Sequence, residues 1–136
     1  MIRFISVKPL IYGVFIALGV AATPVSAQAI LGTWLSPPDG KKQTGHVVVS
    51  RCGAAFCGKL VRTYDRYGQS IITKNTGKTL FWNLVEVSPE TYRNGRVFVP
   101  IMSLTAKAAI DVVGDRLLIS GCAGPICKKQ TWSRVD

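Results

Sequence analysis

Short β-forming runs, each ended by turn residues, make up most of this chain after residue 29. The pattern predicts nine strands, at 30–35, 46–52, 57–64, 69–73, 79–87, 96–101, 106–113, 115–121 and 127–135. Turn signals separate them, namely SPPDG, GAAF, KNTG, SPETYRNG, Gly114-Asp115 and AGPI. Almost nothing repeats with helical period, although LTAKAAI at 104–110 is also compatible with a helical turn. The sequence therefore predicts an all-β domain.

The short connections between these runs favour strands that pair with their neighbours along the chain. Eight or nine such strands in one small domain predict an antiparallel up-and-down meander that closes into a small barrel. Closure also removes the open sheet edges that would otherwise invite pairing with other chains.

The N-terminal residues have the three-part layout of a secretory signal peptide. Arg3 and Lys8 precede an apolar run, LIYGVFIALGVAA, which is followed by Thr23-Pro24 and the small residues of VSAQA. The apolar run is shorter than the roughly 20 residues of a membrane-spanning helix, which argues against an uncleaved anchor. The protein is therefore expected to be periplasmic or secreted, and not an integral membrane protein.

The signal peptide also sets the domain organisation. Cleavage is expected after Ala27 or Ala29, which divides the chain into a signal at 1–27 and a single domain at 28–136. About 108 residues are enough for one domain with a modest core and leave no room for a second.

The expected mature domain is strongly basic. Two of the 17 Lys and Arg fall in the signal, so 15 remain against 7 Asp and Glu, a formal net charge of +8. An exported basic protein meets anionic lipids and cell-wall polymers, so an anionic envelope component is one candidate partner. The alternative is that the charge serves solubility alone. The basic residues are scattered rather than clustered in a run, and nucleic acid is not expected as a partner.

The four cysteines lie in two copies of one motif, Ser-x-Cys-x(4)-Cys-x-Lys, at 50–59 and 120–129. In an exported domain an even number of cysteines indicates disulfides. In each copy two β-forming runs flank a four-residue loop, which places Cys52 opposite Cys57 and Cys122 opposite Cys127. Opposed strand positions have Cα separations that suit a disulfide. We therefore predict two local disulfides that staple the tips of hairpins.

Other uses of the cysteines are less favoured. Pairing between the two hairpins is one alternative, and a Cys₄ zinc site is another, although export argues against the free thiolates that zinc requires. Thioredoxin-like chemistry uses Cys-x-x-Cys at a helix N-terminus, and neither that spacing nor a helix is predicted here.

The strict alternation of side chains along a strand places the cysteines on the outer face of each hairpin. The inward face of the second hairpin gathers Leu117, Ile119 and Trp132. The inward face of the first is assigned to Val47, Val49, Leu60 and Tyr64. Phe56 and Ile126 then become exposed apolar residues of disulfide-clamped loops.

The sequence offers no constellation of catalytic residues. His46 is the only histidine and is assigned to an outer strand face. The acidic residues fall mostly at turns, where Asp bonds its own backbone, and Asp115 lies opposite Arg134 in the second hairpin. No Gly-x-Ser-x-Gly, His-Glu-x-x-His or phosphate loop is present. We therefore expect neither an enzyme nor a metal or cofactor.

A local resemblance connects the two ends of the domain. Gly32-Thr33-Trp34 on the first strand, with Arg134 near the end of the last, resembles the structural signature of lipocalins and related calycin barrels. The resemblance implies that Trp34 packs across the barrel floor under Arg134. Such a stack gains a cation–π interaction, while the guanidinium satisfies nearby carbonyls.

A second resemblance covers nearly the whole domain. Six short motifs follow one another along the domain: Gly32-x-Trp34, Cys52-Gly53, Cys57-Gly58-Lys59-Leu60-Val61, Lys74-Asn75, Gly121-Cys122 and Gln130-Thr131-Trp132-Ser133-Arg134-Val135. This order resembles the bacterial family called domain of unknown function 2147. The resemblance implies a small exported protein with a lipocalin-like barrel and no established activity. The family usually has a Gly-Gly-x-x-Tyr-Asp-Pro-like stretch where this chain has residues 94–100, NGRVFVP, with Val99 in place of the acid.

Binding is the class of function that remains, and the first hypothesis is a small apolar or amphiphilic ligand inside the barrel. Eight strands enclose just enough space for side chains alone or for one small ligand. The candidate lining residues are Phe81, Trp82, Leu84, Tyr64, Phe98 and Ile101, and the site is assigned to Tyr64, Arg62, Trp82 and Phe98. The alternative is that these residues only form the core.

The second hypothesis is a protein-binding module, such as an inhibitor of an exported enzyme. Phe56 and Ile126, held on disulfide-clamped loops, would be rigid anchors for a partner protein. A single exposed patch containing both residues would favour this hypothesis. A non-catalytic structural role in the cell envelope also fits the sequence.

Overall fold

The computed structural model describes residues 9–17, 19 and 29–136. Residues 9–17 form neither helix nor strand, and the expected cleavage region before Ala29 lies outside the described residues. From Gly32 onward the chain forms nine strands: β1 (Gly32–Leu35), β2 (Thr44–Cys52), β3 (Ala55–Tyr64), β4 (Ser70–Ile71), β5 (Thr79–Ser88), β6 (Thr91–Val99), β7 (Leu104–Val113), β8 (Arg116–Ala123) and β9 (Ile126–Arg134). The part of the chain that the structure describes contains no helix with the length and apolarity needed to cross a membrane.

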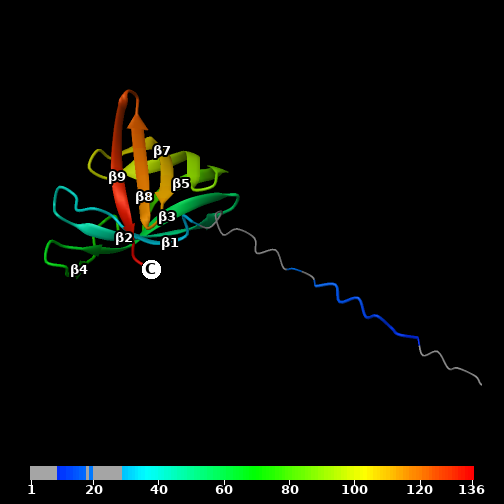
Figure 1. Ribbon diagram of the computed structural model, residues 1–136. Coiled ribbons are helices and arrows are strands. Elements are labelled where there is room, and N and C mark those ends of the chain that lie inside the picture. Colours follow the sequence, from blue (N-terminus) through cyan, green and yellow to red (C-terminus); the bar gives the residue numbers. More distant parts are fainter. Residues whose placement is uncertain (1–8, 18, 20–28) are drawn as a thin grey trace, which may run out of the picture.

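Eight of these strands close into one antiparallel barrel (Figure 1). The strand order is β2-β1-β9-β8-β7-β6-β5-β3-β4, and β2 also pairs with β3. The two-residue strand β4 pairs with the end of β3, beyond the stretch where β3 pairs with β5. The predicted all-β, up-and-down barrel with stapled hairpins is therefore confirmed.

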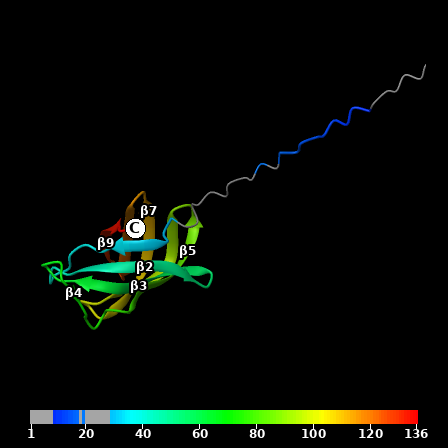
Figure 2. The same ribbon diagram turned by 90° about the horizontal axis from the view of Figure 1, so that it is seen from below.

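Because the strands run up and down in turn, successive connections lie at alternate ends of the barrel (Figures 1 and 2). We call one the open end, which consists of the loops 36–43, 65–78 and 100–103 and the turn at 124–125. The closed end consists of the turns at 53–54, 89–90 and 114–115, together with residues 29–31 and the C-terminus.

The packed core lies toward the closed end of the barrel. Its largest fully buried side chains are Trp34, Tyr92, Phe81, Ile30, Leu84, Ile110, Leu117 and Val47. The rings of Phe56 and Tyr92 meet edge to face, with centroids 5.4 Å apart. Burial raises the pKa of Tyr92, and the negative charge of Glu86 adds to the increase. The buried Tyr92 hydroxyl has no hydrogen-bond partner among the described residues, and it lies within the apolar core cluster.

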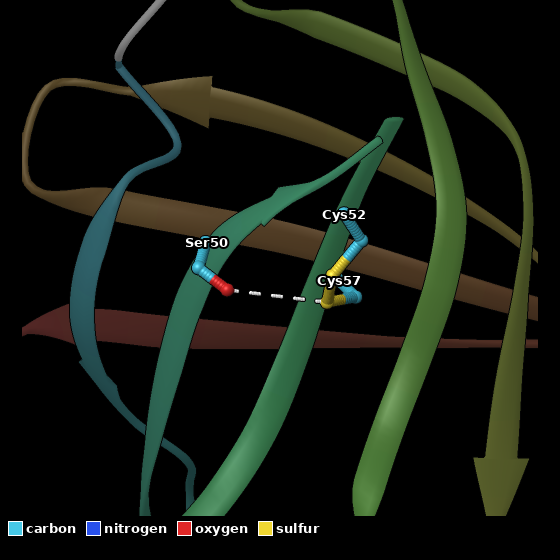
Figure 3. Close-up of a disulfide and its surroundings, with 3 residues drawn as sticks. All are labelled: Ser50, Cys52 and Cys57. Atoms are coloured by element: carbon cyan, nitrogen blue, oxygen red, sulfur yellow. Dashed lines mark hydrogen bonds between the residues drawn. A yellow bond between two sulfur atoms is a disulfide. The ribbon is translucent and has the colours of Figure 1, made fainter. Parts of the chain in front are cut away.

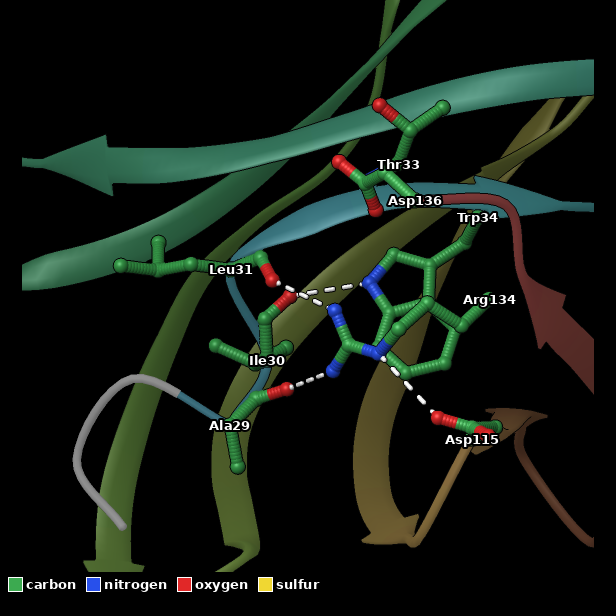
Figure 4. Close-up of polar contacts among 8 residues, drawn as sticks. All are labelled: Ala29, Ile30, Leu31, Thr33, Trp34, Asp115, Arg134 and Asp136. Carbon is green, nitrogen blue, oxygen red and sulfur yellow. Dashed lines mark hydrogen bonds and ion pairs between the residues drawn. The ribbon is translucent and has the colours of Figure 1, made fainter. Parts of the chain in front are cut away.

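Arg134 and Trp34 close this end of the barrel (Figure 4). The guanidinium carbon of Arg134 lies 4.2 Å from the Trp34 ring centroid. Arg134 Nη1 donates to the carbonyl of Leu31 at 2.9 Å, and Nη2 donates to the carbonyl of Ala29 at 2.6 Å. Trp34 Nε1 donates to the carbonyl of Ile30 at 2.9 Å. The stack therefore ties the first strand, the last strand and the segment before β1 together.

The conformation of Gly32 makes room for this stack. Its φ of 127° lies in a region that side chains with a Cβ rarely adopt. A Cβ at this position would lie 2.8 Å from Arg134 Nη1. The glycine of the Gly-x-Trp signature is thus required by the close approach of the guanidinium.

Each disulfide joins the two strands of one hairpin, but the two hairpins differ in register. Cys122 pairs directly with Cys127, with Cα atoms 4.1 Å apart. Cys57 instead pairs with Ser50, so its disulfide to Cys52 runs diagonally across a Cα separation of 5.9 Å. Ser50 Oγ lies 4.0 Å from Cys57 Sγ, and Figure 3 shows this contact beside the disulfide. The predicted pairings are present, but the prediction that Cys52 lies opposite Cys57 is wrong.

The position of one glycine explains the difference in register. Each hairpin turns at a glycine with positive φ, 66° at Gly53 and 58° at Gly124. Two-residue hairpin turns favour such residues. Gly53 follows Cys52 directly, whereas Ala123 separates the second cysteine pair from its glycine, so the first turn is displaced by one residue. Consequently Phe56 faces inward with 3% of its surface exposed, and its prediction as an exposed loop residue is wrong.

A β-bulge in β3 also overturns the inward assignment of Tyr64. His46 pairs with Arg62 and Val47 pairs with Leu60, so Val61 is an extra residue in β3. The strand alternation shifts at this point, and Thr63 becomes the buried residue. Tyr64 turns outward, where its ring packs edge-on against His46 with centroids 4.9 Å apart.

The boundaries of β6 and β7 also differ from the prediction. The turn before β6 is confined to Pro89 and Glu90, and β6 begins at Thr91 rather than at 96. Glu90 and Asn94 have positive φ, 66° and 65°, which lets the chain turn and then bulge without ending the strand. Residues 104–113 form β7, so the alternative of a helical turn at 104–110 is wrong.

Candidate ligand-binding cavity

A cavity of about 310 Å³ lies inside the barrel toward the open end. Its apolar lining includes Leu60, Leu80, Val97, Leu104, Ile119 and Trp132. Residues of the loops 36–43, 72–78 and 100–103 and of the β8–β9 hairpin surround its mouth. A volume of this size falls at the lower end of the range for small-molecule sites, roughly 300–1,000 Å³.

Small inward-facing residues leave this space unfilled. Gly45, Ala106, Gly121 and Ala123 all line the cavity. The corresponding interior of the closed half is filled by large rings, those of Trp34, Phe56 and Tyr92. The same barrel is therefore solid at one end and hollow at the other, because the volume of the inward side chains falls toward the open end.

Trp132 separates the cavity from the core. Its side chain is buried, and its ring centroid lies 6.0 Å from that of Phe81 in the core. Trp132 Nε1 donates a 3.0 Å hydrogen bond to Gln130 Oε1, which also belongs to the lining. The tryptophan thus presents an apolar surface to the cavity while its polar atom is satisfied.

Among the described residues, the charged ones that line the cavity are Asp39 and Lys128. The Asp39 carboxylate accepts hydrogen bonds from the backbone N–H groups of Lys41 and Gln43, at 2.8 and 2.9 Å, and so stabilises its own loop. Lys128 lies on the same face of β9 as Trp132, and its side chain forms no ion pair with another described residue. The mouth therefore offers one cation above an apolar interior.

The structure brings only part of the predicted site to this cavity. Phe98 and Ile101 line it, and Lys78 Nζ lies 5.5 Å from the Phe98 ring centroid. Arg62 and Tyr64 lie on the outer face of β3 because of the bulge at Val61.

The remaining predicted lining residues belong elsewhere. Trp82 is partly buried but belongs neither to the core cluster nor to the cavity lining. It sits beside Asn83, whose φ of 58° interrupts the alternation of β5 between two fully buried residues, Phe81 and Leu84. Phe81 and Leu84 are core residues, as the alternative interpretation proposed.

The residues that create the cavity were missed because the prediction looked for large side chains. Ala106 and Ala108 alternate on β7, where Ala106 lines the cavity and Ala108 belongs to the core, and Gly121 and Ala123 alternate on β8 and both line the cavity. Small residues at every second position of two neighbouring strands are a sequence signal of an unfilled interior. Of the large aromatic residues that the prediction favoured, only Phe98 lines the cavity, and Phe81 belongs to the core.

The structure separates the two residues proposed as anchors for a protein partner. Phe56 lies in the core near the closed end, next to Tyr92. Ile126 lies at the open end, on the rim of the cavity, with 60% of its surface exposed. The two residues therefore do not share an exposed patch.

Comparison with protein families gives an assignment that agrees with the fold. The family model described as "Uncharacterized protein conserved in bacteria (DUF2147)" matches residues 32–134. The chain belongs to this family. The matched range begins at the glycine of the Gly-x-Trp signature and ends at Arg134, so it contains the whole barrel. No curated protein sequence matches the chain.

The barrel of this DUF2147 protein is similar to a solved structure. Protein HP1028 from the human pathogen Helicobacter pylori, described as belonging to the lipocalin family, superposes with a TM-score of 0.62. The sequence identity is 14%, and the match covers 78% of this chain and 82% of that chain. At this identity the likeness establishes a lipocalin-like fold.

Residues 94–100 cross from the core to the cavity. Asn94 has a φ of 65°, a conformation that asparagine tolerates better than most residues. A Cβ at Gly95 would lie 2.5 Å from the Leu84 side chain, so glycine is required there. Further along, Val99 lies on the cavity lining, where it extends the apolar surface of Phe98.

Proposed function

We propose that this protein binds one small apolar or amphiphilic molecule in the barrel cavity. The observation that carries the proposal is the apolar cavity of about 310 Å³, which reaches from the Trp132 floor to the open end. Its surface is mainly aliphatic and aromatic, so a ligand would be held by burial of apolar area. The lipocalin-like fold supports the proposal because barrels of eight strands can enclose one small ligand.

The charges at the mouth favour an amphiphile with an anionic head group. Lys128 is the cation on the lining, whereas the carboxylate of Asp39 is occupied by its own loop. An acyl chain would occupy the apolar interior, and a carboxylate or phosphate would lie beside the Lys128 ammonium. Medium-chain fatty acids are therefore suitable first probes.

Filling the cavity is expected to abolish this binding. Ala106 is buried on β7 and lines the cavity, so the ring of an Ala106→Phe variant would occupy the space of the ligand. We expect the affinity for decanoate to fall by at least about tenfold, the equivalent of roughly 1.4 kcal/mol. Decanoate binding is measured by its displacement of the fluorescent fatty acid cis-parinaric acid, with decanol as the uncharged comparison.

Ala109→Phe is the matched control because Ala109 lies on the same strand but on the outer face. This variant is expected to bind decanoate like the wild type, and thermal unfolding of both variants shows that they are folded. Wild-type affinity in a folded Ala106→Phe protein would place the ligand outside the cavity and contradict the proposal. Equal affinities for decanoate and decanol would mean that the anionic head group does not contribute to binding.

We also propose that the protein acts outside the cytoplasm, and that the mature chain begins at Gln28. Two disulfides are consistent with an oxidising, exported setting. The carbonyl of Ala29 accepts a hydrogen bond from Arg134, and Ile30 is fully buried. Cleavage after Ala29 would remove that acceptor and place a charged amino group on Ile30, beside the Arg134 guanidinium.

Cleavage after Ala27 preserves both features, so we expect the mature protein to begin at Gln28. The measurement is N-terminal sequencing, with the intact mass, of the protein secreted by its own signal. A mature chain that begins at Ile30 would contradict this expectation, and an uncleaved chain would contradict export by a cleaved signal.

A further inference from the structure

The net positive charge of the domain is concentrated around the mouth of the barrel. The loops of the open end and the start of β9 carry seven exposed cations: Lys41, Lys42, Arg66, Lys74, Lys78, Lys128 and Lys129. None of the seven forms an ion pair with another described residue. The same end has two acids, Asp39 and Asp65. Each of these carboxylates accepts two backbone N–H groups of its own loop.

The closed end is nearly neutral, because its five acids lie beside four arginines, Arg51, Arg93, Arg116 and Arg134. Five of the seven acids lie there, on the turns, at the strand ends beside them and at the C-terminus: Glu86, Glu90, Asp111, Asp115 and Asp136. Both ion pairs of the described residues also lie at this end, Arg93–Asp111 at 3.0 Å and Arg134–Asp115 at 3.7 Å. The barrel is therefore an electrostatic dipole whose positive pole surrounds the cavity mouth.

Exposed apolar side chains lie among these cations. Ile72 is 91% exposed, Ile101 is 82% exposed and Met102 is 51% exposed, and all three lie on loops of the open end. Ile126, on the tip of the β8–β9 hairpin, belongs to the same rim, because it lines the cavity together with Ile101 and Met102. Apolar loop tips framed by lysines are the chemistry that recognises an anionic lipid surface.

We propose that the open end docks on a bilayer that contains anionic phospholipid, with the cavity mouth facing the membrane. The lysines contact the head groups, and Ile72, Ile101 and Ile126 enter the interface between them. In this orientation an amphiphile could pass between the bilayer and the cavity without crossing water. The docking surface consists of loop residues and does not require a ligand in the cavity.

The test is flotation of the full-length mature protein with vesicles. Vesicles of phosphatidylcholine with phosphatidylglycerol are compared with vesicles of phosphatidylcholine alone, at low and high salt. We expect binding to the anionic vesicles only, weakened by more than about tenfold when the salt rises from about 0.05 to about 0.5 M. Binding of equal strength to both kinds of vesicle, or binding that salt does not weaken, would overturn the proposal.

Two double variants test which residues form the docking surface. Lys41→Glu/Lys74→Glu is expected to weaken vesicle binding by at least about tenfold, since each cation near an anionic surface contributes about a fivefold gain. Ile72→Ser/Ile101→Ser is expected to weaken it by roughly tenfold as well. The matched control at the closed end is Arg116→Glu/Val113→Ser, which changes one exposed cation and one exposed apolar residue and is expected to bind like the wild type.

Each outcome decides the proposal. Undiminished binding of the isoleucine variant would mean that the loops act only as a polycation, and would overturn the proposed entry of Ile72, Ile101 and Ile126 into the interface. An equal loss in the closed-end control would refute the orientation. The Ala106→Phe variant separates this proposal from ligand binding, because we expect it to float with anionic vesicles while failing to bind decanoate.

Discussion

Trp34→Ala is expected to lower the free energy of unfolding by about 3–5 kcal/mol, the usual loss for a large buried aromatic residue. Trp34 is fully buried, stacks against the Arg134 guanidinium and bonds the carbonyl of Ile30. Alanine would leave a cavity at the closed end and an arginine with no ring beneath it. The effect is large because one side chain holds the two ends of the chain together.

Urea unfolding followed by circular dichroism measures this loss. Trp82→Ala is the control, since Trp82 is only partly buried and lies outside the core cluster, and its cost is expected to be below about 1.5 kcal/mol. Arg134→Ala should fall between the two, because it removes the stack and two backbone hydrogen bonds but leaves the ring in place. Equal losses for both tryptophans would contradict the role assigned to the closed end.

Gly58→Ala is expected to lower the free energy of unfolding by about 1–3 kcal/mol, the usual cost of overpacking a filled core. Gly58 is buried on β3, and a Cβ there would overlap three atoms of the Phe81 ring. Phe81 is itself fully buried and packs near Trp132, so its ring has little room to move. Because Gly58 has no side chain, the Phe81 ring of β5 can lie directly against the backbone of β3 at this position.

A double-mutant cycle tests this explanation. Phe81→Leu alone should also destabilise the protein, because it leaves unfilled volume. Since the smaller leucine makes room for the new methyl group, Gly58→Ala/Phe81→Leu should be more stable than the sum of the single effects predicts. Gly121→Ala is the matched control on the cavity wall, where the nearest atom to a Cβ, Val97 Cγ1, lies at 3.1 Å, and we expect a smaller loss there. Strictly additive effects would contradict a direct clash between Gly58 and Phe81.

Much of the fold could be predicted because its signals are local. β-forming runs and turn residues indicated an up-and-down barrel, and the cysteine motifs indicated two hairpins with internal disulfides. In the second hairpin the predicted register is present, since the turn at Gly124 and Pro125 lies at the centre of AGPI and leaves Cys122 opposite Cys127. Alternation then places Leu117, Ile119 and Trp132 inward, as predicted.

Predictions that depended on an unbroken alternation were wrong at Tyr64 and Phe56. An extra residue at Val61 turned Tyr64 outward, and a turn displaced to Gly53 turned Phe56 inward. A bulge or a turn displaced by one residue reverses every side chain beyond it, and its location depends on how neighbouring strands pair. Local sequence therefore predicts where the strands lie more reliably than it predicts whether a given side chain points inward or outward.

The sequence by itself determined the fold class, the hairpins and their disulfides, because these depend on residues close together in the chain. Only the tertiary structure decided where the interior is hollow and where the charge lies. The cavity wall combines Gly45 on β2 with Ala106 and Gly121 on β7 and β8, and these parts of the sheet enclose one space only after the barrel closes. The basic rim likewise combines loops that are far apart in sequence. Both features combine segments that are far apart in the sequence, and closure of the barrel determines which of these segments lie at the same end.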